Sequence, residues 1–125
     1  MPEIKYFNAV DSRDEMLASL KRDGAIIVED AVDELFIDSL RKETDPYMKL
    51  SRPGQDEFSG KYTTRTGGLV SRSSKCRELI QSQLILDMCD GLLLDHCGRY
   101  QLHLTQIIRV KPKETRQLIH KDKWA

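Results

Sequence analysis

The sequence predicts an α+β fold in which helices come first and strands come last. Two observations support this order. Apolar residues recur at helical spacing through the first two-thirds of the chain, between capping residues and helix-ending glycines. β-branched residues accumulate afterwards, before a turn that contains proline. A length of 125 residues suits one domain of ordinary size, so we expect a single domain over residues 1–125.

The first predicted helix runs from Ser12 to Gly24. Ser12 and Glu15 have the spacing of a capping box, and Gly24 is suited to end the helix. The apolar residues between them are Met16, Leu17 and Leu20. The run Ala25–Glu29 that follows has the composition of a short buried strand.

A second helix is predicted from Asp33, which can cap it, to Pro46, which lacks the amide needed to continue it. The polar stretch from residue 50 to 60 is expected to be a loop. Residues 61–65 are expected to be extended, and the glycine pair at 67–68 is expected to turn the chain.

Two further helical stretches follow. Ser73 or Ser74 can open the first, which should reach about Ser82. The second covers residues 84–94, and Gly98 is expected to stop it.

The last part of the chain is predicted to be two strands. Residues 100–110 are rich in β-prone types, and residues 111–114 contain a proline suited to a turn. Residues 116–122 would then be the returning strand. The sheet would therefore only be starting at the end of this sequence.

Charge and composition narrow the classes of partner. Twenty basic and twenty acidic residues balance, so we expect neither a nucleic-acid interface nor an acidic tail. The longest apolar runs are far too short to cross a bilayer, and no signal-like segment opens the sequence. We therefore expect a cytoplasmic protein whose three cysteines are reduced.

His120 and Asp122 form the most informative pair in the sequence. Residues two apart on a strand point to the same face. An imidazole and a carboxylate on one face are two of the three ligands of a facial-triad iron site. The pair alone is a weak signal, because a surface histidine beside a solvated aspartate has the same spacing. Gln117, three residues earlier, and the preceding β-prone run add context.

The chain resembles the phytanoyl-CoA dioxygenase family of Fe(II)/2-oxoglutarate-dependent oxygenases over nearly its whole length. Four segments carry the resemblance in order, and the last is the most specific. They are Leu20 to Val28, Thr63 to Leu69, Tyr100 to Gln106, and Gln117 to Asp122.

This resemblance implies N-terminal helices followed by the first part of a double-stranded β-helix, or jelly roll. It implies that His120 and Asp122 bind Fe(II), and that Gln117 and Arg65 help to hold 2-oxoglutarate. The latter two residues are equally compatible with a substrate pocket. The implied reaction uses O2 to oxidise a small organic substrate, commonly by hydroxylation, while 2-oxoglutarate is decarboxylated to succinate. No separate catalytic side chain is predicted.

The sequence departs from the family pattern after Asp122. Family members place a second iron-binding histidine and an arginine farther along, whereas the other two histidines here, His96 and His103, lie upstream. His103, which lies on the predicted strand, is considered as a substitute for the missing third iron ligand. We therefore expect a truncated domain that binds iron weakly, is inactive alone and self-associates through uncovered strand edges. A partial sequence, a truncated gene model and a short isoform all remain open.

Two other interpretations of the function of this chain remain open. The chain could be a non-catalytic interaction module, or a pseudoenzyme, that retains the N-terminal half of the fold. It could also be a small zinc protein, although the spacing of its cysteines and upstream histidines matches none of the common zinc patterns. Those residues are Cys89, His96, Cys97 and His103.

Overall fold

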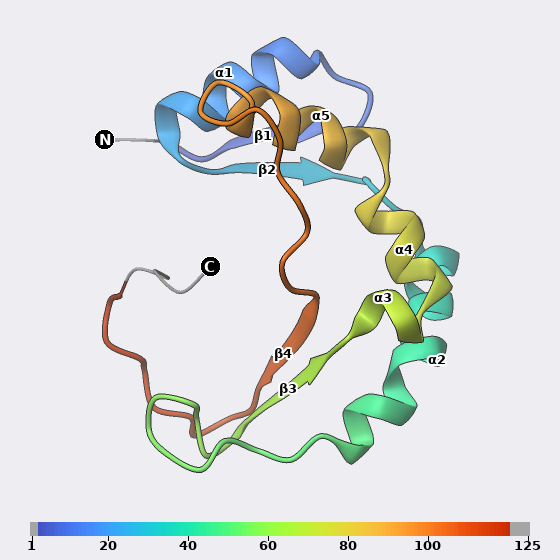
Figure 1. Ribbon diagram of the computed structural model, residues 1–125, viewed down its shortest axis with the longest axis vertical. Coiled ribbons are helices and arrows are strands. Elements are labelled where there is room, and N and C mark those ends of the chain that lie inside the picture. The colour runs from blue at the N-terminus through green and yellow to red at the C-terminus, as the bar shows by residue number, and fades with distance from the viewer. Residues whose placement is uncertain (1–2, 121–125) are drawn as a thin grey trace. The chain divides into compact units, whose positions relative to one another are not determined.

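The computed structural model describes residues 3–120, which form short helices and two small sheets (Figure 1). Within these residues the chain divides into two compact units. Unit 1 takes the stretches up to Asp38 and Arg77–Gln101, and unit 2 takes Ser39–Cys76 and the stretch from Leu102 onward. The single domain over residues 1–125 stays a prediction, as does the jelly roll, because neither small sheet is closed.

Unit 1 contains a parallel pair of strands, β1 (Lys5–Asn8) and β2 (Ile26–Glu29). The intervening helix α1 (Arg13–Asp23) makes the crossover that parallel strands require (Figure 1). The sequence analysis predicted β2 but missed β1. It was also wrong about burial, because β2 belongs to a sheet of only two strands and Ile27 is 38% exposed.

The predicted caps of α1 are confirmed. Ser12 Oγ accepts a hydrogen bond from the Glu15 amide at 3.4 Å. Gly24 adopts the left-handed conformation with φ 81°, and its amide donates to Leu20 O at 2.9 Å. Only glycine takes this conformation without steric cost, which explains why the helix ends there.

Helix α5 (Gln83–Leu93) packs against α1 in unit 1. Arg13 on α1 pairs with Asp87 on α5 at 3.4 Å. A Cβ at Gly91 would lie 2.3 Å from Leu17 Cδ2, so this glycine lets the two helices approach closely. The helix ends before the predicted stop at Gly98, since the amides of His96 and Cys97 already turn back to Leu93 O.

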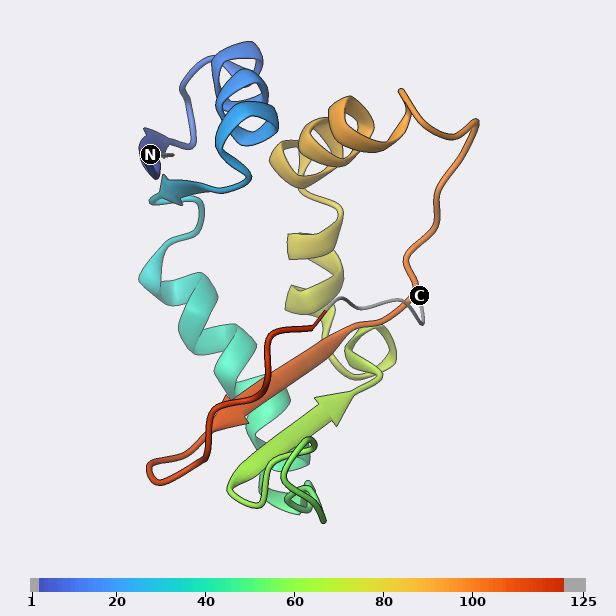
Figure 2. The ribbon, with the colours of Figure 1, turned by 90° about the vertical axis from the view of Figure 1, so that its left-hand side faces the viewer.

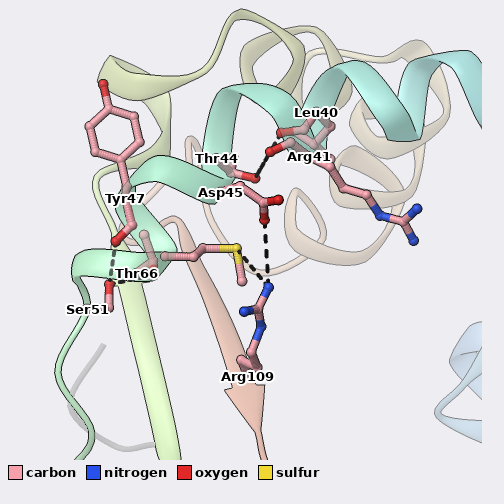
Figure 3. A network of polar contacts seen from close by, with 9 residues as sticks. Leu40, Arg41, Thr44, Asp45, Tyr47, Ser51, Thr66 and Arg109 are labelled. Atoms are coloured by element: carbon pink, nitrogen blue, oxygen red, sulfur yellow. Dashed lines mark hydrogen bonds and ion pairs between the residues drawn. The ribbon is translucent and has the colours of Figure 1, made fainter.

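For helix α2 (Glu34–Leu50), the predicted start is confirmed and the predicted end is wrong. Asp33 Oδ1 accepts from the Phe36 amide at 2.7 Å, as its predicted capping role requires. Pro46 does not end the helix, which continues to Leu50. The last turn has partners within unit 2: Arg72 lies over the Tyr47 ring. Ser51 Oγ, just after the helix, lies 2.7 Å from Thr66 Oγ1 (Figure 3). These contacts offset the one backbone hydrogen bond that proline removes.

Unit 2 is built on an antiparallel pair, β3 (Thr63–Gly67) and β4 (Gln106–Val110). Arg65 pairs with Ile108, and Thr64 pairs with Arg109. Because side chains alternate along a strand, Arg65 and Arg109 lie on opposite faces of this sheet. Arg109 is engaged on its own face, 3.7 Å from Asp45 (Figure 3).

The end of the chain differs from prediction in two places. The strand begins at Gln106 rather than Tyr100, so His103 lies in coil. After the turn at residues 112–113, no strand is assigned to residues 116–120, although the chain turns back there (Figure 2). Residues 121 and 122 of the predicted returning strand lie outside the described residues. The strand prediction for 116–120 is therefore wrong, since these residues pair with no strand among residues 3–120.

Two short helices follow β3. Gly68, with φ 67°, leads into α3 (Leu69–Arg72), and α4 (Ser74–Ile80) confirms the helix predicted from Ser73 or Ser74. No helix among residues 3–120 is long and apolar enough to cross a membrane.

Glu43 of α2 accepts hydrogen bonds from residues at the start of α4. Its carboxylate accepts from Ser73 Oγ and Ser74 Oγ, each at 2.6 Å, and from the Lys75 amide at 3.0 Å. The Ser73 and Ser74 bonds, then the Lys75 bond, lower the pKa of Glu43 from 4.5 to about 2. A carboxyl whose folded pKa is depressed contributes stability above its unfolded pKa and loses it as pH falls through the folded pKa.

Glu43→Gln is therefore expected to reduce the acid sensitivity of the chain. Melting temperatures at pH 7 and pH 3 measure the effect. The wild-type chain should lose stability as pH falls from 4.5 toward about 2, and the variant should lose less over the same interval. An equal loss in both chains would show that this carboxylate does not titrate with folding.

Candidate functional site

A hollow of about 260 Å³ opens on the Arg65 face of the β3–β4 sheet in unit 2. Its floor contains Ile108 and Val110, which are 54% and 65% exposed. The loop before β3 and the segment after β4 form its walls. A second hollow of about 410 Å³ shares residues of both walls, including Glu57 and Gln117. Polar groups thus surround an apolar floor, as in many small-molecule sites.

The wall before β3 is the loop from Gly54 to Gly60, which we call the 54–60 loop. Its ends are joined by the Gly54 amide, which donates to Gly60 O at 3.0 Å. Inside it, Asp56 Oδ1 accepts from the Ser59 amide at 2.6 Å and from Ser59 Oγ at 2.7 Å. These bonds lower the pKa of Asp56. The loop predicted from the polar composition is therefore confirmed, and local hydrogen bonds hold it together.

Arg65 reaches the 54–60 loop from β3. The side chain is half-buried, lines the hollow, and donates from Nη1 to the Ser59 carbonyl oxygen. The guanidinium carries five donors, so this one bond leaves it able to make further bonds to an acceptor in the hollow.

Gln117 and His120 reach the same loop from the other wall. Gln117 Nε2 donates to the Phe58 carbonyl oxygen. The rings of His120 and Phe58 lie 5.2 Å apart between centroids, at 60° to one another, within the range of favourable aromatic pairs. His120 is exposed, and its Nδ1 lies 2.8 Å from the Leu118 carbonyl oxygen.

The structure thus gathers three of the four predicted site residues around Phe58 and Ser59. Arg65 comes from β3, Gln117 and His120 come from the segment after β4, and all three meet at one loop. The fourth, Asp122, lies outside the described residues. Among residues 3–120, no three His, Cys, Asp or Glu side chains lie close enough together to hold a metal.

Glu114 is a prominent residue of the hollow that the sequence analysis missed. Its Oε2 accepts from the Tyr62 amide at 2.6 Å and from Thr63 Oγ1 at 2.8 Å. Its Oε1 accepts from the Thr115 amide at 3.1 Å. Desolvation raises the pKa of Glu114, but these bonds and the charge of Arg65 outweigh it and hold the pKa below its usual value. The Glu114 carboxylate is therefore charged at neutral pH and accepts three hydrogen bonds.

Charge at the hollow is mixed. Arg65 and Arg116 line it together with Glu57 and Glu114. The Glu114 carboxylate bonds to β3 and to its own turn, whereas the Arg65 guanidinium keeps donors beyond its bond to Ser59. The arrangement can bind a small carboxylic acid by charge-assisted hydrogen bonds over an apolar floor.

Comparison with known proteins gives several relatives that are named dioxygenases. Dioxygenase swnH2 of Arthroderma benhamiae is 30% identical over 89 residues, which are 70% of this chain and 28% of that protein. Multifunctional dioxygenase prhA of Penicillium brasilianum is 27% identical over 132 residues, covering 97% of this chain and 42% of the relative. Dioxygenase cdmA of Talaromyces verruculosus is 23% identical over 127 residues, covering 95% and 43%.

The chain is related to dioxygenases. It spans less than half of the length of each of these relatives. No protein-family model matches it. The relationship agrees with an oxidoreductase and says nothing of a metal or cosubstrate, so those depend on the residues at the hollow.

Proposed function

We propose that this chain is part of an Fe(II)/2-oxoglutarate-dependent dioxygenase of the phytanoyl-CoA dioxygenase family. In this proposal, His120 and Asp122 bind the iron, and Arg65 and Gln117 hold the cosubstrate. The observation that carries it is the convergence of Arg65, Gln117 and His120 on the 54–60 loop beside one hollow. The relationship to named dioxygenases supports the same class of reaction.

The chemistry of His120 fits an iron ligand. A neutral imidazole that donates Nδ1–H to the Leu118 carbonyl carries its lone pair on Nε2. Metal-binding histidines commonly have such a backbone acceptor, which fixes the tautomer and orients the ring. The carboxylate of Asp122, two residues later in the sequence, suits the same ferrous ion.

The donors of Arg65 and Gln117 fit the cosubstrate. 2-Oxoglutarate carries two carboxylates, and a guanidinium can bind one of them through two parallel hydrogen bonds. The side-chain amide of Gln117 can donate to a carboxylate or keto oxygen. The hollow, at about 260 Å³, is slightly below the usual range of about 300–1,000 Å³ for ligand pockets, as suits a small dicarboxylate.

When bound, ferrous iron and 2-oxoglutarate would supply the activation of O2 for oxidation of the substrate. The residues of this chain would orient the cosubstrate against the metal and shape the floor on which a small organic substrate rests. A third iron ligand would come from the part of the protein that the relatives have and this chain does not span. We therefore expect weak iron binding by these 125 residues alone.

An anaerobic titration of Fe(II) tests the proposal. The chain has one tryptophan, Trp124, two residues after Asp122, so quenching of its fluorescence reports metal at the pair. Adding 2-oxoglutarate should tighten the apparent iron affinity and produce the visible absorption of a ferrous 2-oxo acid chelate. No metal-dependent change at any concentration would contradict the proposal and favour a non-catalytic interaction module.

Arg65→Ala is expected to weaken 2-oxoglutarate binding about ten- to hundredfold, because a hydrogen bond to a charged group contributes about 1.5–3 kcal/mol. Arg109→Ala is the matched control. Arg109 lies on the neighbouring strand but on the opposite face, where it pairs with Asp45. Titration of 2-oxoglutarate into the iron-loaded chain measures both. Equal effects of the two substitutions would place the cosubstrate elsewhere.

A further inference from the structure

The segment from Thr115 to His120, which we call the 115–120 segment, belongs to no strand, and its first residues, Thr115 to Gln117, line the hollow. Gln117 donates to the Phe58 carbonyl oxygen, and the His120 ring lies against the Phe58 ring, so both residues contact the 54–60 loop. Both contacts are made by long or exposed side chains, so they need a firmer attachment nearby. Glu114, which immediately precedes this segment, provides one.

Glu114 joins this segment to β3 across about fifty residues of sequence. Glu114 Oε2 accepts hydrogen bonds from the Tyr62 amide and from Thr63 Oγ1, and Thr63 is only 4% exposed. The Lys111 amide donates to Tyr62 O at 3.1 Å and brings the turn to the same point. The carboxylate is therefore anchored in the least exposed part of the β3 start.

Gly60 leaves room for this carboxylate. A Cβ at Gly60 would lie 2.6 Å from Glu114 Oε2 and 2.7 Å from Thr63 Oγ1, and the residue has φ 84°. A side chain there would be strained and would push the carboxylate away. The end of the 54–60 loop, β3 and the turn after β4 thus meet at one carboxylate.

We propose that Glu114 is a positioning residue: its hydrogen bonds to Tyr62 and Thr63 hold the 115–120 segment so that Gln117 and His120 face the 54–60 loop. The consequence for metal and cosubstrate rests on the proposed function. The positioning itself does not, because it concerns contacts within the free chain.

Substitutions at Glu114 and Thr63 can remove different numbers of the hydrogen bonds to the Glu114 carboxylate. Glu114→Ala removes all three acceptor contacts. Glu114→Gln can keep the two bonds on one oxygen, but its amide nitrogen would then face the Thr115 amide, which is also a donor. Thr63→Val removes one donor from the other side with little change of volume. We expect the largest effect from Glu114→Ala and smaller effects from the other two.

Glu43→Ala is the matched control. Glu43 is also a carboxylate of unit 2 with three hydrogen bonds, but they lead to Ser73, Ser74 and Lys75, far along the chain from the 115–120 segment. Its loss should destabilise the unit without releasing His120. A purely structural role for Glu114 would make the two variants behave alike.

The experiment combines proton NMR of the metal-free chain with the Fe(II) titration. In the wild-type chain and in Glu43→Ala, cross-relaxation should connect the rings of Phe58 and His120. In Glu114→Ala this signal should disappear, and iron affinity should fall about tenfold, the lower end of the effect of orienting partners at metal sites. Thr63→Val, which removes one of the three bonds to Glu114 with little change of volume, is the milder test and should weaken the ring signal.

Three outcomes decide the matter. Retention of the ring signal in Glu114→Ala overturns the positioning role, and so does its loss in both Glu114→Ala and Glu43→Ala. Loss in Glu114→Ala alone supports it. If the wild-type chain shows the ring signal and binds no iron, the proposed function fails while the ring signal in the variants still decides the role of Glu114.

Discussion

Met16→Ala is expected to lower the free energy of unfolding by about 2–5 kcal/mol, the usual cost of truncating a fully buried methionine. Met16 is 0% exposed and lies on α1 between its caps. The only other buried residues of unit 1 are Phe7 on β1 and Ser19 on α1, within the residues that the structure describes. A core this small has little apolar area to offset the cavity.

The loss should be confined largely to unit 1. Hydrogen exchange measured by peptide mass spectrometry should show α1 and α5 exchanging faster in Met16→Ala, with smaller change in β3 and β4. Met48→Ala, at a half-buried methionine of unit 2, is the control and should cost less. If Met48→Ala were equally costly, or if α1 kept its protection in Met16→Ala, burial of Met16 would not be what stabilises unit 1.

Local signals in the sequence predict the helix starts well. Ser12 and Asp33 cap α1 and α2 through side-chain oxygens that bond amides three residues later. Such bonds involve neighbours in the chain, so their pattern can be read without knowing the fold. Gly24 is of the same kind, because a left-handed backbone position is a local requirement.

Predictions failed where distant contacts decide the outcome. Pro46 would end an isolated helix, but the turn after it is held by Arg72 and Thr66, which come later in the chain. Strand β1 carries no strong alternation of its own and forms because it pairs with β2. The strand predicted for residues 116–120 fails for the opposite reason, since a β-prone run needs a partner strand to become one.

The same distinction between local signals and distant contacts applies to the candidate site. Arg65, Gln117 and His120 were chosen from a family resemblance and from residue chemistry, and the structure brings them to one loop. The sequence does not predict a role for Glu114, because this role depends on hydrogen bonds to Tyr62 and Thr63. No sequence pattern links residues that lie so far apart in the chain. A glutamate in a charged turn looks the same whether it is solvated or bonded.

His120→Ala is expected to abolish measurable metal binding by this chain, a loss of at least about a hundredfold. Substituting an outer partner of a metal ligand costs about 10–100-fold, so removing a ligand itself should cost more. Asp122→Asn should act similarly, because an amide oxygen lacks the charge that binds a ferrous ion. Loss of the electron paramagnetic resonance signal of free Mn(II) on binding measures the affinity without oxygen-sensitive iron.

His103→Ala separates a specific site from general attraction of metal to histidine. His103 is exposed and lies in coil before β4, so it offers the same imidazole without a carboxylate two residues away. The substitution His103→Ala should therefore leave the affinity for Mn(II) unchanged. Equal losses in His103→Ala and His120→Ala would show diffuse binding by surface imidazoles. A loss only in His120→Ala and Asp122→Asn would identify the pair as the metal ligands, since the resemblance and the backbone contact of His120 predict that pattern and random surface binding does not.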